Sequence, residues 1–91
     1  MAYVVVTLKI MPESPDVDLE KIQKKAEKEV KNFGGNVGKV EIEEVAFGLK
    51  AINIFFTMDE KQSNTDPLEE NVSALDGVNS AQITDIRRAI G

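Results

Sequence analysis

The side chains of this chain that could do chemistry are carboxylates, lysines and arginines, because its 91 residues include no cysteine and no histidine. Thiol nucleophiles, imidazole bases, zinc sites and iron–sulfur clusters are thereby excluded. The pairs Glu43 with Glu44 and Glu69 with Glu70 could bind a divalent cation. Adjacent residues point apart, however, so these pairs are better interpreted as solvated surface. We therefore expect no catalytic acid or base and no cofactor.

Lysines could also bind an anion as a stripe along one predicted helix. These lysines are Lys21, Lys24, Lys25, Lys28 and Lys31. They are interleaved with Glu20, Glu27 and Glu29, which favours a solvated helix face over an anion site. The whole chain carries 16 acidic and 11 basic residues, a net charge of -5. That charge opposes non-specific binding to nucleic acid, so no direct nucleic-acid partner is expected.

Two apolar runs, residues 3–11 and 49–58, predict the central strands of a sheet, because β-branched and aromatic residues dominate them. Residues 40–45 alternate apolar side chains with glutamates, which is typical of a half-exposed edge strand. The segment 78–90 contains apolar residues at strand spacing and predicts a fourth strand.

Apolar residues at spacings of three and four predict a helix over residues 19–33. Asp16 or Asp18 is available to cap its start, and Gly34 with Gly35 ends it. A second, shorter helix is predicted further along the chain. There Asp66, Pro67 and Glu69 provide a cap, a proline at the first helical position and a glutamate at the third, which is a capping-box arrangement.

The predicted order is strand, helix, strand, strand, helix, strand, and right-handed crossovers place both helices on one face of an antiparallel sheet. This is the ferredoxin-like α/β plait, an α+β fold, with the first and third strands at the centre. We expect residues 1–91 to form a single domain. The predicted core is Val4, Val6, Leu8, Ile10, Leu19, Ile22, Val30, Phe33, Ile52, Ile54, Phe56, Leu68, Val72, Leu75 and Ile83.

Several functions of this fold are disfavoured by the residues present. The first loop, "MPESPD", lacks the thiolates of a metallochaperone. For stacking RNA bases, the first predicted strand has only Tyr3 at its very end, and the third offers a single outward candidate, Phe55. No glycine-rich loop with an arginine exists in the first half to hold an acyl phosphate. No run approaches the roughly 20 apolar residues that span a bilayer. The sequence therefore predicts a cytoplasmic protein without a membrane partner.

Phe47 and Gly48 lie between two apolar runs, where a hairpin connection ordinarily carries small polar residues. From the residues alone, the ring is either an exposed anchor for a partner or a lid over the edge of the core. Arg87 and Arg88 come at the end of the last predicted strand. They serve solubility or a surface ion pair, or they extend on a mobile tail to contact an anion.

The stretch "VAFGLKAINI" resembles the aromatic–glycine turn, followed by an apolar residue, lysine and a strand, of the translation elongation factor 1-beta nucleotide-exchange domain. "MPESPDVDLEKI", "MDEKQSNTDPLEE" and "GVNSAQITDIRRAI" are similar to other parts of that family, so the resemblance covers nearly the whole chain. The short length looks like the archaeal form. The resemblance implies a guanine-nucleotide exchange factor for elongation factor 1-alpha, the GTPase that delivers aminoacyl-tRNA to the ribosome.

The resemblance also implies roles for particular residues. Phe47, Gly48 and Lys50 would bind the GTPase, and Arg88, or Arg87 in its place, would displace the bound GDP by disturbing its magnesium and phosphate region. Such a factor, here expected to be a monomer when free, needs no catalytic acid or base, since it acts by differential binding. The alternative is a small regulatory or metabolite-binding plait domain, which would leave nucleotide release from a GTPase unchanged.

Overall fold

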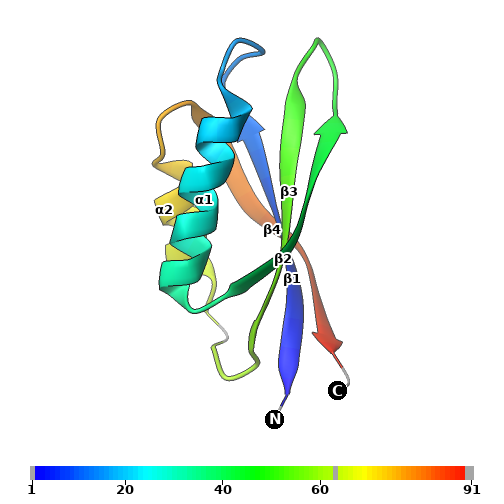
Figure 1. The fold of residues 1–91 in the computed structure, drawn as a ribbon, viewed down its shortest axis with the longest axis vertical. Coiled ribbons are helices and arrows are strands. Elements are labelled where there is room, and N and C mark those ends of the chain that lie inside the picture. Colours follow the sequence, from blue (N-terminus) through cyan, green and yellow to red (C-terminus); the bar gives the residue numbers. More distant parts are fainter. Residues whose placement is uncertain (1, 63, 90–91) are drawn as a thin grey trace.

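The computed structural model describes residues 2–62 and 64–89. Its elements are β1 (Tyr3–Pro12), α1 (Leu19–Phe33), β2 (Asn36–Glu44), β3 (Lys50–Asp59), α2 (Asp66–Ser73) and β4 (Val78–Ala89). The strands form one antiparallel sheet in the order β2-β3-β1-β4, and both helices cover one of its faces (Figure 1). The ferredoxin-like plait predicted from the sequence is thereby confirmed.

The core lies between this sheet face and the two helices. Ten predicted core residues are fully buried: Val6, Leu8, Ile10, Ile22, Val30, Ile52, Ile54, Phe56, Leu68 and Val72. The others pack against them while partly exposed: Val4, Leu19, Phe33, Leu75 and Ile83. The sequence prediction missed four members of this core: Ala26, Met58, Val78 and Ala81. The predicted core residues of the strands and helices therefore all belong to the core or pack against it.

The edge strand β2 is longer than predicted, because it begins at Asn36 rather than at Val40. Its pairing with β3 shifts register between Val37 and Lys39, with Gly38 as the extra residue. Val37 and Val40 both pack against the core on either side of this irregularity. The alternation of side chains that marks a strand is interrupted there, which explains why the first part of β2 was not recognised.

The start of α1 is capped by Asp18, one of the two aspartates predicted for this position. Its carboxylate accepts hydrogen bonds from the backbone N–H groups of Glu20, at 3.1 Å, and Lys21, at 3.3 Å. Gly34 ends the helix with a φ of 104°, in the left-handed region that glycine adopts without strain.

We expect Asp18→Ala to lower the free energy of unfolding by about 1 kcal/mol, because two backbone donors at the start of α1 lose their acceptor. Asp16→Ala is the matched control. It removes a neighbouring exposed aspartate, and its effect should stay below about 0.5 kcal/mol. Urea denaturation of both variants measures the difference, and equal effects would show that the cap contributes nothing beyond its charge.

The capping box predicted for α2 is wrong. Thr65 occupies the cap position without a side-chain hydrogen bond, and the backbone N–H of Asp66 bonds to the side-chain oxygen of Asn64 at 3.2 Å. The Glu69 carboxylate instead accepts a hydrogen bond from the backbone N–H of Ile83 at 2.6 Å. Ile83 borders the register shift between β1 and β4. Glu69 therefore satisfies a strand amide next to this irregularity instead of forming the capping box.

The molecule is elongated, with extents of 42 × 21 × 17 Å. The β1–α1 and β2–β3 connections lie at one end, which we call the hairpin end (Figure 1). The β3–α2 connection, the start of β1 and the last residues of β4 lie at the opposite end, which we call the terminal end. The strand register agrees, because Lys50 pairs with Glu44 at one end of β3 and Asp59 pairs with Tyr3 at the other.

Candidate functional site

Phe47 lies at the tip of the β2–β3 connection, and its side chain is 96% exposed. The N–H of Leu49 donates to the carbonyl of Ala46 at 2.9 Å, which closes a tight turn with Phe47 and Gly48 at its centre. Both central residues have positive φ, 56° and 78°, as a type I′ hairpin turn requires. The prediction that Phe47 is exposed at the tip is confirmed, and the interpretation of its ring as a lid over the core is wrong.

Phenylalanine is an unfavourable residue for this position. Asparagine, aspartate and glycine are preferred in a type I′ turn, and a bulky residue at positive φ carries about 1–3 kcal/mol of local strain. Phe47 is the only non-glycine residue with positive φ among the described residues. Because its exposed ring gains almost no burial in return, folding stability does not account for the choice of residue.

Further apolar side chains lie close to Phe47 along the chain. Val45 is 45% exposed and Ile42 is 49% exposed, although both are large apolar residues. A shallow hollow of about 330 Å³ is lined by residues 44–50, Phe47 and Lys50 among them. The hairpin end therefore presents an apolar tip with an exposed lysine beside it, an arrangement suited to binding another protein.

Pro15, in the β1–α1 connection, is a neighbour of the hairpin that the sequence analysis did not single out. A Cβ atom built on Gly48 would lie 3.8 Å from Cγ of Pro15, in ordinary van der Waals contact. Pro15, Gly48 and Lys50 line a second hollow of about 240 Å³. This contact could have been predicted from the fold topology alone, because the plait brings the β1–α1 and β2–β3 connections to the same end of the sheet.

Below the tip, charged side chains on the sheet face that the helices do not cover form contacts with one another and with neighbouring polar groups. Glu43 accepts a hydrogen bond from the side-chain amide of Asn53 at 2.9 Å and lies 3.7 Å from the ammonium group of Lys9. The hydrogen bond from Asn53, followed by the charge of Lys9, lowers the pKa of Glu43. Lys39 lies over the ring of Phe55, 5.2 Å from its centroid. Phe55 is thus already covered by a side chain of its own sheet.

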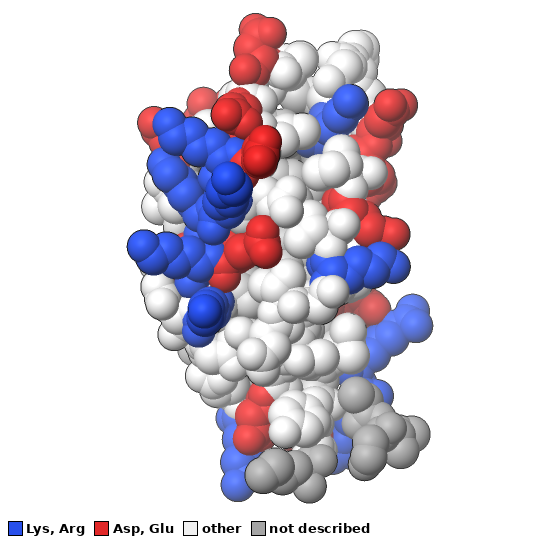
Figure 2. Space-filling model, in the orientation of Figure 1, with Lys and Arg blue, Asp and Glu red and all other residues white. Residues whose placement is uncertain are grey.

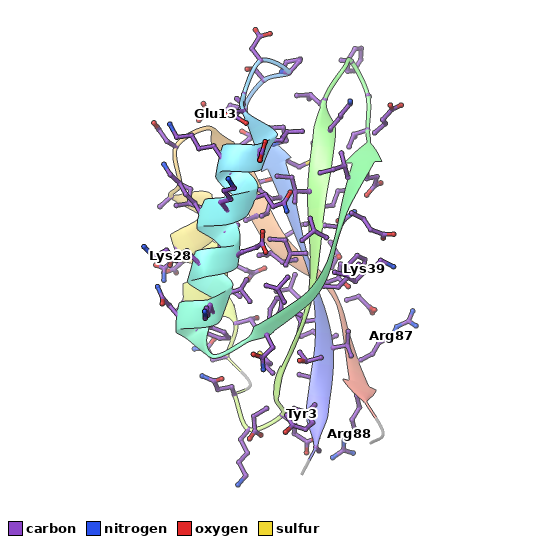
Figure 3. All side chains as sticks on the ribbon, in the orientation of Figure 1. Tyr3, Glu13, Lys28, Lys39, Arg87 and Arg88 are labelled. Carbon is purple, nitrogen blue, oxygen red and sulfur yellow. The ribbon has the colours of Figure 1, made fainter. Side chains whose placement is uncertain are left out.

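Arg87 and Arg88 lie within β4, paired with Val5 and Val4 of β1, rather than on a mobile tail beyond the strand. They point to opposite faces of the sheet, and Figure 3 shows both near the terminal end, with Arg87 directed away from the helices. Arg87 forms a 2.8 Å ion pair with Asp85 two residues away on the same strand. Residues 90–91, which the predicted strand partly included, lie outside the described residues.

Arg88 is bound to both carboxylate oxygens of Glu60, which lies in the β3–α2 connection. Its Nε donates to one oxygen at 2.8 Å and its Nη2 donates to the other at 2.7 Å. These hydrogen bonds and the arginine charge lower the pKa of Glu60, against the opposing effects of partial burial and of Asp59. The same contacts raise the pKa of Arg88 above its ordinary value.

We expect the Glu60 carboxyl to titrate below the ordinary glutamate value of about 4.3 and to return toward it in Arg88→Ala. Because the folded-state pKa of Glu60 is depressed, its contribution to stability is present above the unfolded-state pKa. That contribution is lost as the pH falls through the folded-state value. Carbon-13 NMR of the side-chain carboxyl measures both midpoints, and an unchanged midpoint in Arg88→Ala would contradict the pairing in solution.

The predicted site residues therefore form two groups rather than one cluster. Phe47, Gly48 and Lys50 belong to the hairpin end, whereas Arg87 and Arg88 belong to the terminal end of the 42 Å molecule. Within the described ranges 2–62 and 64–89, no group of three or more acidic residues could hold a metal ion. Over the same ranges, no helix is long and apolar enough to cross a bilayer.

The lysines of α1 belong to neither group. They gather on the exposed side of the helix with glutamates beside them (Figure 2), and Lys24 pairs with Glu20 at 3.7 Å. Lys28 points outward from α1 in Figure 3. This arrangement agrees with the solvated helix face expected from the sequence.

Comparisons with known proteins agree over nearly the whole chain. Residues 5–89 match the family described as EF-1 guanine nucleotide exchange domain. The elongation factor 1-beta of Methanothermobacter thermautotrophicus is 40% identical over 88 residues, 97% of this chain and 98% of that protein. The protein of the same name from Methanobrevibacter smithii is 46% identical over 88 residues, again 97% of this chain and 98% of the relative.

Solved structures show the same fold at much lower sequence identity. The C-terminal domain of the MgtC protein from Mycobacterium tuberculosis superposes with a TM-score of 0.63 at 7% identity, covering 96% of this chain and 87% of that one. The designed protein Foldit4 superposes with a TM-score of 0.61 at 19% identity, covering 98% of each chain. Likeness at these identities shows a shared fold and does not bear on activity.

Proposed function

Because the chain belongs to the family of the EF-1 guanine nucleotide exchange domain, we propose that it promotes release of GDP from elongation factor 1-alpha, so that GTP can rebind during translation elongation. The observation that carries this proposal is the extent of the family match, residues 5–89 of 91. The factor acts in the cytoplasm as a monomer, in which residues 1–91 are a single exchange domain, and it uses no catalytic acid or base.

Exchange of this kind follows from differential binding. An exchange protein that binds the nucleotide-free GTPase more tightly than the GDP-bound form weakens the affinity for GDP by the same ratio, because coupling between two ligands is reciprocal. The protein therefore needs contact surfaces with the right shape and charge, and no reactive group. The exposed Phe47 at the hairpin end and the exposed Arg88 at the terminal end are consistent with this requirement.

Phe47 is proposed as the anchor on the GTPase, with Gly48 and Lys50 beside it. The positive φ of Phe47 directs its ring away from the protein's own core before any partner arrives. Binding then buries an apolar ring without first breaking contacts within the factor, which lowers the cost of association. Val45 and Ile42 supply further exposed apolar surface near the anchor.

Arg88 is proposed as the group that displaces the nucleotide, with Arg87 as its substitute. A guanidinium can compete with a magnesium ion for phosphate oxygens and thereby weaken the hold of the GTPase on GDP. Arg88 and Phe47 lie at opposite ends of one continuous sheet. The factor would therefore contact two separate surfaces of its partner, with β3 and β1 fixing the spacing between the anchor and the displacing group.

Release of fluorescently labelled GDP from elongation factor 1-alpha tests the proposal. The GTPase is loaded with labelled GDP and magnesium, and excess unlabelled GDP is added with or without this protein. We expect the protein to accelerate release by at least about tenfold, which corresponds to a barrier lower by about 1.4 kcal/mol. A metabolite-binding plait domain would leave the rate unchanged, and that result would overturn the proposed function.

A further inference from the structure

Glu60 and Arg88 meet across two elements that are far apart in sequence. Glu60 follows β3 at its C-terminal end, and Arg88 is one of the last residues of β4. The carboxylate receives the guanidinium side-on, through Nε and Nη2, at 2.8 and 2.7 Å. Parallel hydrogen bonds of this kind fix the orientation of the guanidinium plane as well as its position.

Glu60 is itself held by a turn with several backbone constraints. Its N–H donates to the carbonyl of Ala2 at 3.2 Å, which ties the turn to the chain before β1. The side chain of Asp59 accepts from the N–H of Lys61 at 2.9 Å. The side-chain amide of Gln62 donates to the carbonyl of Phe33 at 2.9 Å, which ties the turn to the end of α1. Arg88 is therefore oriented by the body of the protein, whereas Arg87 pairs only along its own strand.

Glu60 binds the guanidinium of Arg88 along the edge formed by Nε and Nη2. The edge formed by Nη1 and Nη2 takes no part in this contact. Nη1 and the second hydrogen of Nη2 form a further pair of parallel donors, suited to the oxygens of a phosphate. Arg88 can therefore keep its contact with Glu60 while it approaches an anion. Its side chain is 70% exposed, so a partner has access to it.

We infer that Glu60 is a positioning residue for nucleotide displacement, which holds the guanidinium of Arg88 by one edge and presents its other edge to a phosphate of the partner's nucleotide. The inference rests on the proposed exchange function and extends it to a residue outside the candidate site. Because the pair is neutral as a whole, its effect on the nucleotide depends on the orientation of the donors and not on added net charge. Removing Glu60 leaves a mobile cation, which must be ordered during each encounter.

The test compares Glu60→Ala, Arg88→Ala and the double variant in release of labelled GDP from the loaded GTPase, over a range of factor concentrations. We expect Glu60→Ala to slow the maximal rate by about fivefold, with the concentration for half-maximal effect changed less than the rate. In the double variant, Glu60→Ala should add nothing to the effect of Arg88→Ala, since residues that act as a unit are not additive. Glu60→Asp, which keeps the charge, should recover part of the rate.

Glu41→Ala is the matched control, because it removes another exposed glutamate in an ion pair, with Lys39 at 3.3 Å, and should leave release unchanged. Equal slowing by Glu60→Ala with and without Arg88 would show a general structural role and overturn the inference. A Glu60→Ala variant that releases GDP as fast as the wild type would also overturn the inference, because Glu60 would then have no role in release. A faster variant would overturn it too, because Glu60 would then hinder the action of Arg88. Failure of the proposed function is distinct, since the wild-type protein would not accelerate release at all.

Discussion

Phe47→Ala is expected to weaken binding to the partner GTPase by at least about thirtyfold, which corresponds to about 2 kcal/mol. The reason is that an exposed aromatic ring with no role in the core loses only its intermolecular contacts when it is truncated. The melting temperature should stay the same or rise slightly. Alanine keeps the strain of the positive φ, and the ring that it removes is exposed and contributes almost nothing to the core. Titration calorimetry with the nucleotide-free GTPase measures the affinity, and thermal unfolding of the free variant measures stability.

Two further variants separate the ring from the turn. Phe47→Asn suits a type I′ turn and should raise the melting temperature while it abolishes the anchor. Phe47→Leu keeps an apolar side chain and should retain part of the affinity. If Phe47→Ala instead lowers the melting temperature sharply and binds the GTPase normally, the ring supports the fold, and the hairpin end is not the anchor.

Arg88→Ala is expected to slow the maximal rate of GDP release by at least about tenfold. The fold should be retained, because the side chain is exposed and its only described hydrogen bonds are those with Glu60 at the surface. Binding to the nucleotide-free GTPase should change little, since the anchor at the hairpin end is untouched. Stopped-flow fluorescence with labelled GDP, at saturating factor, measures the rate.

Arg87→Ala is the natural comparison, because it removes an adjacent guanidinium that points to the opposite face of the sheet. It should slow release much less than Arg88→Ala does, and the double variant, which also removes the substitute guanidinium, should be the slowest of the three. A double variant that releases GDP at the wild-type rate would remove both arginines from the mechanism. The hairpin end would then have to account for all of the exchange.

The fold could be predicted because its determinants are local and repetitive. Apolar runs rich in β-branched and aromatic residues marked β1 and β3 as central strands, and spacings of three and four marked the buried face of α1. These patterns survive in the structure because one face of each element is buried against the other layer. The position of Phe47 between two strands also followed from sequence, since any hairpin must turn there.

The features that could not be predicted from the sequence depend on contacts between residues that are distant in the chain. Glu69 fits a capping box by spacing alone, but the amide of Ile83 beside the β4 irregularity provides a competing donor. The pairing of Arg88 with Glu60 joins residues 28 positions apart and carries no local signal. The separation of the two predicted groups likewise appears only when the long strands are paired in register.

Affinity for the GTPase in its nucleotide-free and GDP-bound forms tests the central claim most directly. An exchange factor can shift the nucleotide equilibrium only by its own difference in affinity for these two forms. Titration calorimetry is run with both forms under the same magnesium concentration. We predict that this protein binds the nucleotide-free GTPase at least about tenfold more tightly than the GDP-bound form. Equal affinities for the two forms would contradict exchange by differential binding.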